Sequence, residues 1–268
     1  MVCAGNALDF GHLRIWAVLQ RIALCYGIVS VLAITINHRY FIHTIIGLLV
    51  IYMGIIAFGN GYAYDSSVNI ISQVDLHLFG YDHLYHKSPV DPEGLLSTLP
   101  AIAHTMIGFL CCKYISIAGQ SVHSKIKFLK IAGLVMLTLG FFLSLIGFGI
   151  NKRIWSPSYV FVTCGFAAWL LSILVQIIDN KGEDTEGKNS YATTLFLAFG
   201  MNPLFLYVMS EFLAIVFGSF GIKSDIFSLI QSLITDDYLA SLTYALFFVA
   251  IHAVMGIWMY KKKIFIKL

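Results

Sequence analysis

The sequence has 268 residues, of which 59% are hydrophobic and 12% are charged, and its formal net charge is +3. A soluble domain usually has about a quarter of its residues charged, so this composition excludes an ordinary soluble globular protein. Basic tracts with interleaved aromatic residues are absent from the sequence, and we therefore expect no nucleic acid among its partners.

Several stretches stay apolar over the roughly 20 residues that a helix needs to cross a bilayer. We expect spans at residues 14–36, 40–59, 95–118, 127–150, 156–178, 191–218 and 238–260. The sequence therefore predicts an all-α fold, a polytopic membrane bundle of about seven transmembrane helices in one integral-membrane domain covering residues 1–268. Lys261–Lys263 and the loops on the same side carry more lysine and arginine than the opposite loops, which predicts a cytoplasmic C-terminus.

The first apolar stretch contains two arginines, Arg14 and Arg21. Residues seven apart lie on nearly the same face of a helix, so both guanidinium groups point the same way. Such a group is costly among lipid tails unless it faces a protein interior or a watery cavity, and two on one stripe favour an anionic ligand such as a phosphate. Alternatively, Arg14 reaches the membrane interface and Arg21 pairs with a neighbouring acid.

The longest polar stretch, residues 60–94, is expected to be a non-cytoplasmic loop and is rich in Tyr, His and Asp. Aromatic rings beside acids are typical of a sugar-binding surface, although an ordinary interfacial loop is also rich in Tyr. Asp75, His77, His83 and His86 match no metal-ligand spacing, and we expect no metal.

Asp91 and Glu93 lie just before the third expected span. Acids at a helix start are favoured by the helix dipole, so capping alone explains them as well as a ligand does. His104 lies deeper in the same span. A histidine in a membrane helix usually packs against a hydrogen-bond partner, and a proton-handling role is the alternative.

Glu211 is a carboxylate in an otherwise apolar segment, so it needs a partner, for which Arg14 or Arg21 is the candidate. Asn202 and Glu211 are nine residues apart and would lie on opposite faces of a regular helix. Both can line one pocket only if the helix breaks, and Pro203 offers that break.

Four stretches together resemble the transmembrane acetyltransferase family of heparan-α-glucosaminide N-acetyltransferase and its bacterial relatives. They are Leu13–Tyr26 (LRIWAVLQRIALCY), Asp91–Gly108 (DPEGLLSTLPAIAHTMIG), Asn151–Tyr159 (NKRIWSPSY) and Gly200–Glu211 (GMNPLFLYVMSE). The family more often has Pro-Gly in place of Trp16-Ala17. The stretches recur in family order over nearly the whole chain, which makes the resemblance specific.

The resemblance implies a multi-pass enzyme of the bacterial inner membrane that moves acetyl from cytosolic acetyl-CoA to an amino sugar on the far side. It implies that Arg14, Gln20 and Arg21 bind acetyl-CoA or brace its pocket. The expected substrate or pocket residues are Asp91, Glu93, His104, Asn202 and Glu211. The bilayer, acetyl-CoA and the amino-sugar acceptor are the expected partners.

Family members also carry earlier helices with an H-x-x-W-N-G segment, whose histidine is the family's catalytic residue. This sequence has no W-N-G, so we assign the catalytic role to none of its residues. We expect a truncated product, or a chain that works with a separately encoded N-terminal half or as a homo-oligomer. The alternative functions are an ion- or proton-coupled transporter, with Arg21, His104 and Glu211 as its relay, and an inactive fragment.

Overall fold

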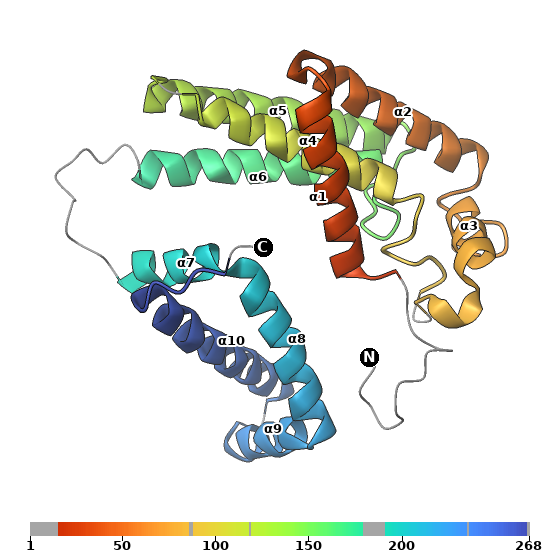
Figure 1. Ribbon diagram of the computed structural model, residues 1–268. Coiled ribbons are helices and arrows are strands. Elements are labelled where there is room, and N and C mark those ends of the chain that lie inside the picture. The colour runs from red at the N-terminus through yellow and green to blue at the C-terminus, as the bar shows by residue number, and fades with distance from the viewer. Residues whose placement is uncertain (1–15, 86–87, 118, 179–190, 235, 267–268) are drawn as a thin grey trace. The chain divides into compact units, whose positions relative to one another are not determined.

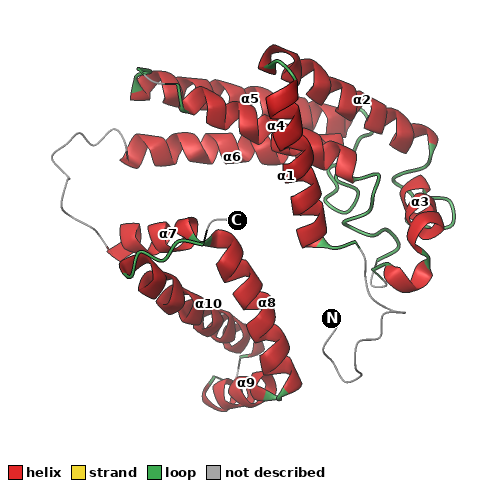
Figure 2. Ribbon diagram, viewed as in Figure 1, coloured by secondary structure: helices red, strands yellow, loops and turns green. Residues whose placement is uncertain are grey.

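The computed structural model describes residues 16–85, 88–117, 119–178, 191–234 and 236–266. Within these ranges every regular element is a helix, as Figure 2 shows. The described residues fall into two compact units, one within residues 10–184 and the other formed by the residues after 184.

The first unit contains most of the helices (Figure 1). In chain order they are α1 (Val18–Thr35), η2 (His38–Tyr40), α2 (Phe41–Phe58), α3 (Ile70–Phe79), η3 (Tyr81–His83), α4 (Thr98–Ile115), α5 (Val122–Leu145) and α6 (Pro157–Ile178). Helix α3 and the short turn η3 lie within the stretch expected to be a loop. Asn69 caps α3 by accepting a hydrogen bond from the Ile71 N–H, so a polar residue starts this helix.

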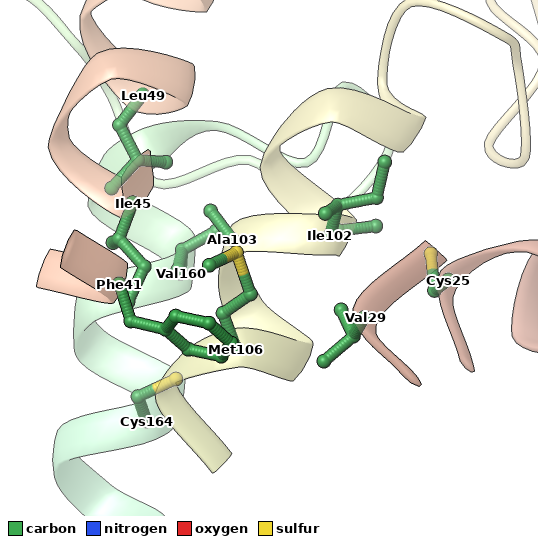
Figure 3. Close-up of a cluster of buried hydrophobic side chains, with 11 residues drawn as sticks. Cys25, Val29, Phe41, Ile45, Leu49, Ile102, Ala103, Met106, Val160 and Cys164 are labelled. Carbon is green, nitrogen blue, oxygen red and sulfur yellow. The ribbon is translucent and has the colours of Figure 1, made fainter. Parts of the chain in front are cut away.

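Helix α4 lies at the centre of the first unit, because α1, α2 and α6 all pack against it. Figure 3 shows Met106 of α4 between Phe41 of α2 and Val29 of α1, with Val160 of α6 nearby. These side chains are buried, whereas Phe58 at the end of α2 is 95% exposed. Apolar side chains on the outer surface are what a bilayer accommodates.

Helices α5 and α6 pack with their backbones in contact, because glycines line both surfaces. A Cβ placed on Gly165 of α6 would lie 2.8 Å from the Gly133 carbonyl oxygen and 2.8 Å from the Leu137 nitrogen. Small residues allow this approach between membrane helices, where dispersion contacts supply much of the association energy.

The second unit contains α7 (Tyr191–Met201), α8 (Pro203–Ser219), α9 (Ile222–Leu233) and α10 (Asp237–Lys261). Helices α7 and α8 meet at an angle of 83°. Pro203 is the first residue of α8, where its missing N–H does no harm, and Asn202 between the helices is not helical. The break expected at Pro203 is therefore present.

Six helices of the described chain are long and apolar enough to cross a membrane, or 7 if α7 and α8 form one span. This confirms the polytopic all-α fold. The span expected at 127–150 instead begins at Val122, because Ser121 caps the helix by accepting from the Ser124 N–H. The first turns of α5 contain lysines, so a prediction based on apolar length alone placed the start of the helix too late.

Candidate functional site

The candidate site is centred on Arg21, whose side chain is only 5% exposed although it lies in the first turn of α1. Its Nη1 donates to the Pro92 carbonyl oxygen at 2.9 Å, and its Nη2 donates to the Gly94 carbonyl oxygen at 3.0 Å. Nη2 also donates to Ser97 Oγ. A buried guanidinium needs acceptors for its N–H groups, and the segment before α4 provides them.

A buried carboxylate holds the same segment from the other side. Asp75 of α3 is 0% exposed, and its Oδ1 accepts from the Leu95 N–H at 2.8 Å. The Gly94 carbonyl and the Leu95 N–H belong to one peptide group. Arg21 therefore binds the negative end of this peptide dipole, and Asp75 binds its positive end. We call this arrangement the peptide-bridged pair.

Gly94 is required by the close packing of the peptide-bridged pair. A Cβ at this position would overlap Asp75 Oδ2. The Gly94 carbonyl oxygen also accepts from Ser97 Oγ at 2.9 Å and from Thr98 Oγ1 at 3.2 Å. The sequence G-x-x-S-T thus closes the turn that leads into α4.

Burial raises the pKa of Asp75 from 3.8 to about 6. The hydrogen bond from Leu95 and the charge of Arg21 lower this pKa, whereas the neighbouring Asp91 raises it. Asp75 Oδ2 is buried and has no hydrogen-bond partner among the described residues, which is consistent with the dominance of desolvation.

Trp155, in the segment between α5 and α6, covers the other side of Arg21. The Arg21 Cζ lies 5.0 Å from the centre of the Trp155 ring, within the range of a cation–π interaction. His104 of α4 lies 5.9 Å from that ring and Tyr159 of α6 lies 5.4 Å from it, between ring centroids. Trp155 has a φ of +52°, a conformation that is unfavourable for a bulky residue.

Hydrogen bonds fix the segment that carries Trp155. Ser156 Oγ accepts from the Asn151 N–H at 3.0 Å and from the Tyr159 N–H at 3.2 Å. The hydroxyl of Tyr52, a fully buried residue of α2, donates to the Ile154 carbonyl oxygen. Helices α2 and α6, together with Asn151 in the segment itself, therefore hold the positive φ of Trp155 in place.

The structure brings some of the predicted residues together. Arg21 lies at the centre of the site. His104 packs against Trp155, the ring that lies against Arg21. Asp91 is buried beside it and accepts from the N–H groups of Tyr85, at 3.1 Å, and Glu93, at 2.9 Å, so this acid shapes the segment before α4.

Other predicted residues lie elsewhere. Gln20 is exposed on α1, and Glu211 is exposed on α8 in the second unit. Asn202 binds the backbone of the C-terminal segment: its Nδ2 donates to the Ile264 carbonyl oxygen at 3.0 Å and its Oδ1 accepts from the Ile266 N–H at 2.8 Å. Arg14 and His86 lie outside the described residues.

Sequence reasoning missed the roles of Asp75 and Trp155. Asp75 is the one acid in the apolar stretch Ile70–Phe79, a signal that could have separated it from the polar loop around it. Trp155 lies within a family-like stretch but was not singled out. The described residues contain no group of three or more His, Cys, Asp or Glu side chains that could hold a metal ion.

No model of a known protein family matches the sequence. The chain is 31% identical over 153 residues to human (Homo sapiens) heparan-α-glucosaminide N-acetyltransferase, a match that covers 52% of this chain and 22% of the human protein. It is 32% identical over 155 residues to the mouse (Mus musculus) enzyme, with coverage of 52% and 23%. The match thus spans less than a quarter of the length of these curated relatives. Over about half of its length, this multi-pass membrane chain is related to heparan-α-glucosaminide N-acetyltransferase.

Proposed function

We propose that this chain forms the substrate-binding part of a membrane acetyltransferase. In this proposal the enzyme takes acetyl from cytosolic acetyl-CoA and delivers it to an amino sugar on the non-cytoplasmic side of a bacterial inner membrane. The relation to an N-acetyltransferase and the long apolar helices support the proposal.

The convergence of three family-like stretches at Arg21 is the observation that carries the proposal. The first stretch supplies Arg21, the second supplies the carbonyl oxygens of Pro92 and Gly94, and the third supplies Trp155. Pro92 and Gly94 of the second stretch lie 71 and 73 residues after Arg21 in the sequence. Motifs so far apart that meet at one buried cation favour a shared site over separate structural roles.

The contacts of Arg21 favour one of its two expected roles. Both terminal nitrogens donate to the segment before α4, so we assign Arg21 to bracing the pocket rather than to holding phosphates. Arg14 and Gln20 stay candidates for acetyl-CoA binding. Asp91, Glu93 and His104 stay candidates for the acceptor side, and Asn202 and Glu211 for a pocket in the second unit.

The direction of the helices supports the proposed sidedness. Helices α1, α4 and α6 begin near the Arg21 site, and a chain that alternates sides places their starts together. If α7 and α8 form one span, a cytoplasmic Lys261–Lys263 puts these starts on the non-cytoplasmic side. The site would then face the compartment that holds the acceptor, and the acetyl group of cytosolic acetyl-CoA would have to reach Gln20 and Arg21 through the helix bundle.

The test uses the purified chain in lipid nanodiscs with radiolabelled acetyl-CoA and glucosamine. We expect saturable acetyl-CoA binding that unlabelled CoA displaces, and weaker binding by Arg21→Ala at a temperature well below the melting temperature of that variant. Lys223→Ala, a control that removes an exposed cation of α9, should leave binding unchanged. Formation of N-acetylglucosamine would support a complete enzyme, and donor binding without transfer would support a chain completed by a separately encoded half. Absence of donor binding, or equal binding by Arg21→Ala, would count against the pocket.

A further inference from the structure

Three aromatic side chains form a cluster beside the peptide-bridged pair. They are Trp155, Tyr159 and His104, which we call the aromatic cluster. Tyr159 packs edge-on against Trp155, with 74° between the rings, and His104 is tilted by 53° against the same indole. All three side chains are partly exposed, so the cluster reaches the surface of its unit.

The aromatic cluster contains polar atoms without partners. Trp155 Nε1 and His104 Nδ1 are buried and form no hydrogen bond with any described residue. The Nε of Arg21, the residue stacked on Trp155, is also buried and forms no hydrogen bond with any described residue. Buried polar atoms are nearly always paired in native proteins, so several around one ring require an explanation.

The backbone of Trp155 adds an independent observation. Its φ of +52° is unfavourable for a tryptophan, and the hydrogen bonds around Ser156 hold it there. Strained residues persist where the surroundings force them, and they gather at binding and catalytic sites. Trp155 therefore combines a strained backbone with an unpaired side-chain donor.

The chemistry of the aromatic cluster selects a class of ligand. Two of the unpaired atoms, Trp155 Nε1 and Arg21 Nε, can only donate, and the imidazole of His104 can donate or accept. Aromatic faces pack against the C–H face of a sugar ring, and its hydroxyl oxygens accept hydrogen bonds. The carboxylates of Asp91 and Glu93 act electrostatically on Arg21 and would favour a positively charged amine nearby.

We infer that the aromatic cluster is the binding platform for the acceptor amino sugar. The sugar ring packs against Trp155 and Tyr159, and its hydroxyls hydrogen-bond Trp155 Nε1 and His104 Nδ1. Both nitrogens are closed to solvent in the free chain, so the Trp155 ring turns when the sugar binds. This inference rests on the proposed acetyltransferase function, because it assigns the acceptor of that reaction.

The first experiment measures binding of glucosamine to the full chain in nanodiscs, with glucose and N-acetylglucosamine as comparison sugars. Trp155→Ala should weaken glucosamine binding by about tenfold or more, and Trp155→Phe, which keeps a ring but removes the donor, by a smaller factor. Trp169→Phe is the matched control, because Trp169 is 46% exposed on α6 outside the cluster. It should bind glucosamine like the wild type.

A second experiment reads the indole directly. The chain has 4 tryptophans, and Trp16→Phe, Trp169→Phe and Trp258→Phe together leave Trp155 as the one tryptophan, whose emission can be excited selectively over that of the tyrosines. Glucosamine should shift or quench its emission, and glucose should do so less. This measurement keeps the inference testable if Trp155→Ala does not fold.

The outcomes separate this inference from the proposed function. If the wild type binds acetyl-CoA but not glucosamine, or if Trp155→Ala binds both ligands like the wild type, the platform is refuted and the acetyltransferase proposal stands. If glucosamine binding depends on Trp155 while acetyl-CoA does not bind, the platform is upheld and the donor part of the proposed function fails.

Discussion

Replacement of Arg21 by alanine should destabilise the first unit strongly. The Pro92 carbonyl oxygen would lose its donor, and the buried carboxylate of Asp75 would lose the cation at the far end of its peptide bridge. Gly94 would keep its bonds from Ser97 and Thr98. A buried acceptor left without its charged donor costs about 1.5–3 kcal/mol, so the loss at Pro92 alone predicts a melting temperature lower by roughly 5 °C.

The assay is thermal unfolding of the purified chain in detergent at pH 7.5, where Asp75 is mostly ionised. Arg39→Ala is the control: Arg39 is exposed and contacts the neighbouring Tyr40, so its loss should change the free energy of unfolding by less than about 0.5 kcal/mol.

A double-mutant cycle tests the bridge itself. Arg21→Met with Asp75→Asn removes both charges, and the pair should cost less than the sum of the single changes by about 1–3 kcal/mol. Additive single effects, or an Arg21→Ala change no larger than that of Arg39→Ala, would refute the peptide-bridged pair.

Three further changes test other parts of the structure. Because the pKa of Asp75 rises from 3.8 to about 6 on folding, the folded chain binds this proton more tightly, and stability should fall as pH rises from about 4 to about 6.5. In thermal unfolding across that pH range, Asp75→Asn should not show this loss of stability. An identical pH dependence of the melting temperature would contradict the raised pKa of Asp75. Gly165→Leu should separate α5 from α6 and lower the melting temperature, whereas Gly27→Leu, where nothing lies within 4 Å of a Cβ, should not. Asn202→Ala should expose the segment around Ile264 to limited proteolysis, and unchanged cleavage would show that the side chain does not hold it.

The long apolar helices could be predicted because each depends on local composition. Most expected spans correspond to a helix of suitable length, and Pro203 marked the break between α7 and α8. The 83° angle could not be read from the sequence, since it depends on packing after the break. Helix α3 was missed because its 10 residues are too few to cross a membrane and mix apolar with polar residues.

The partners of Arg21 could not be predicted for a different reason. The sequence indicated that a cation at this depth needs acceptors, and we expected a ligand anion or an acidic side chain. Its acceptors are instead the carbonyl oxygens of Pro92 and Gly94 and the hydroxyl of Ser97. Every residue carries a carbonyl oxygen, so no residue type marks the two that bind Arg21.

Arg21 belongs to the peptide-bridged pair and also contacts the aromatic cluster. One face of its guanidinium group lies over Trp155, while its terminal nitrogens hold the segment that Asp75 binds from the opposite side. Asp75 and Arg21 bind the same peptide group, so a change at Asp75 should shift the position of Arg21. Because Arg21 packs on the indole of Trp155, that shift should change the environment of the indole. Asp75→Asn should thus shift the emission of a lone Trp155, although α3 and the segment that carries Trp155 are about 80 residues apart in the sequence. If that emission does not respond, the pair and the aromatic cluster are separate structures that share a neighbour.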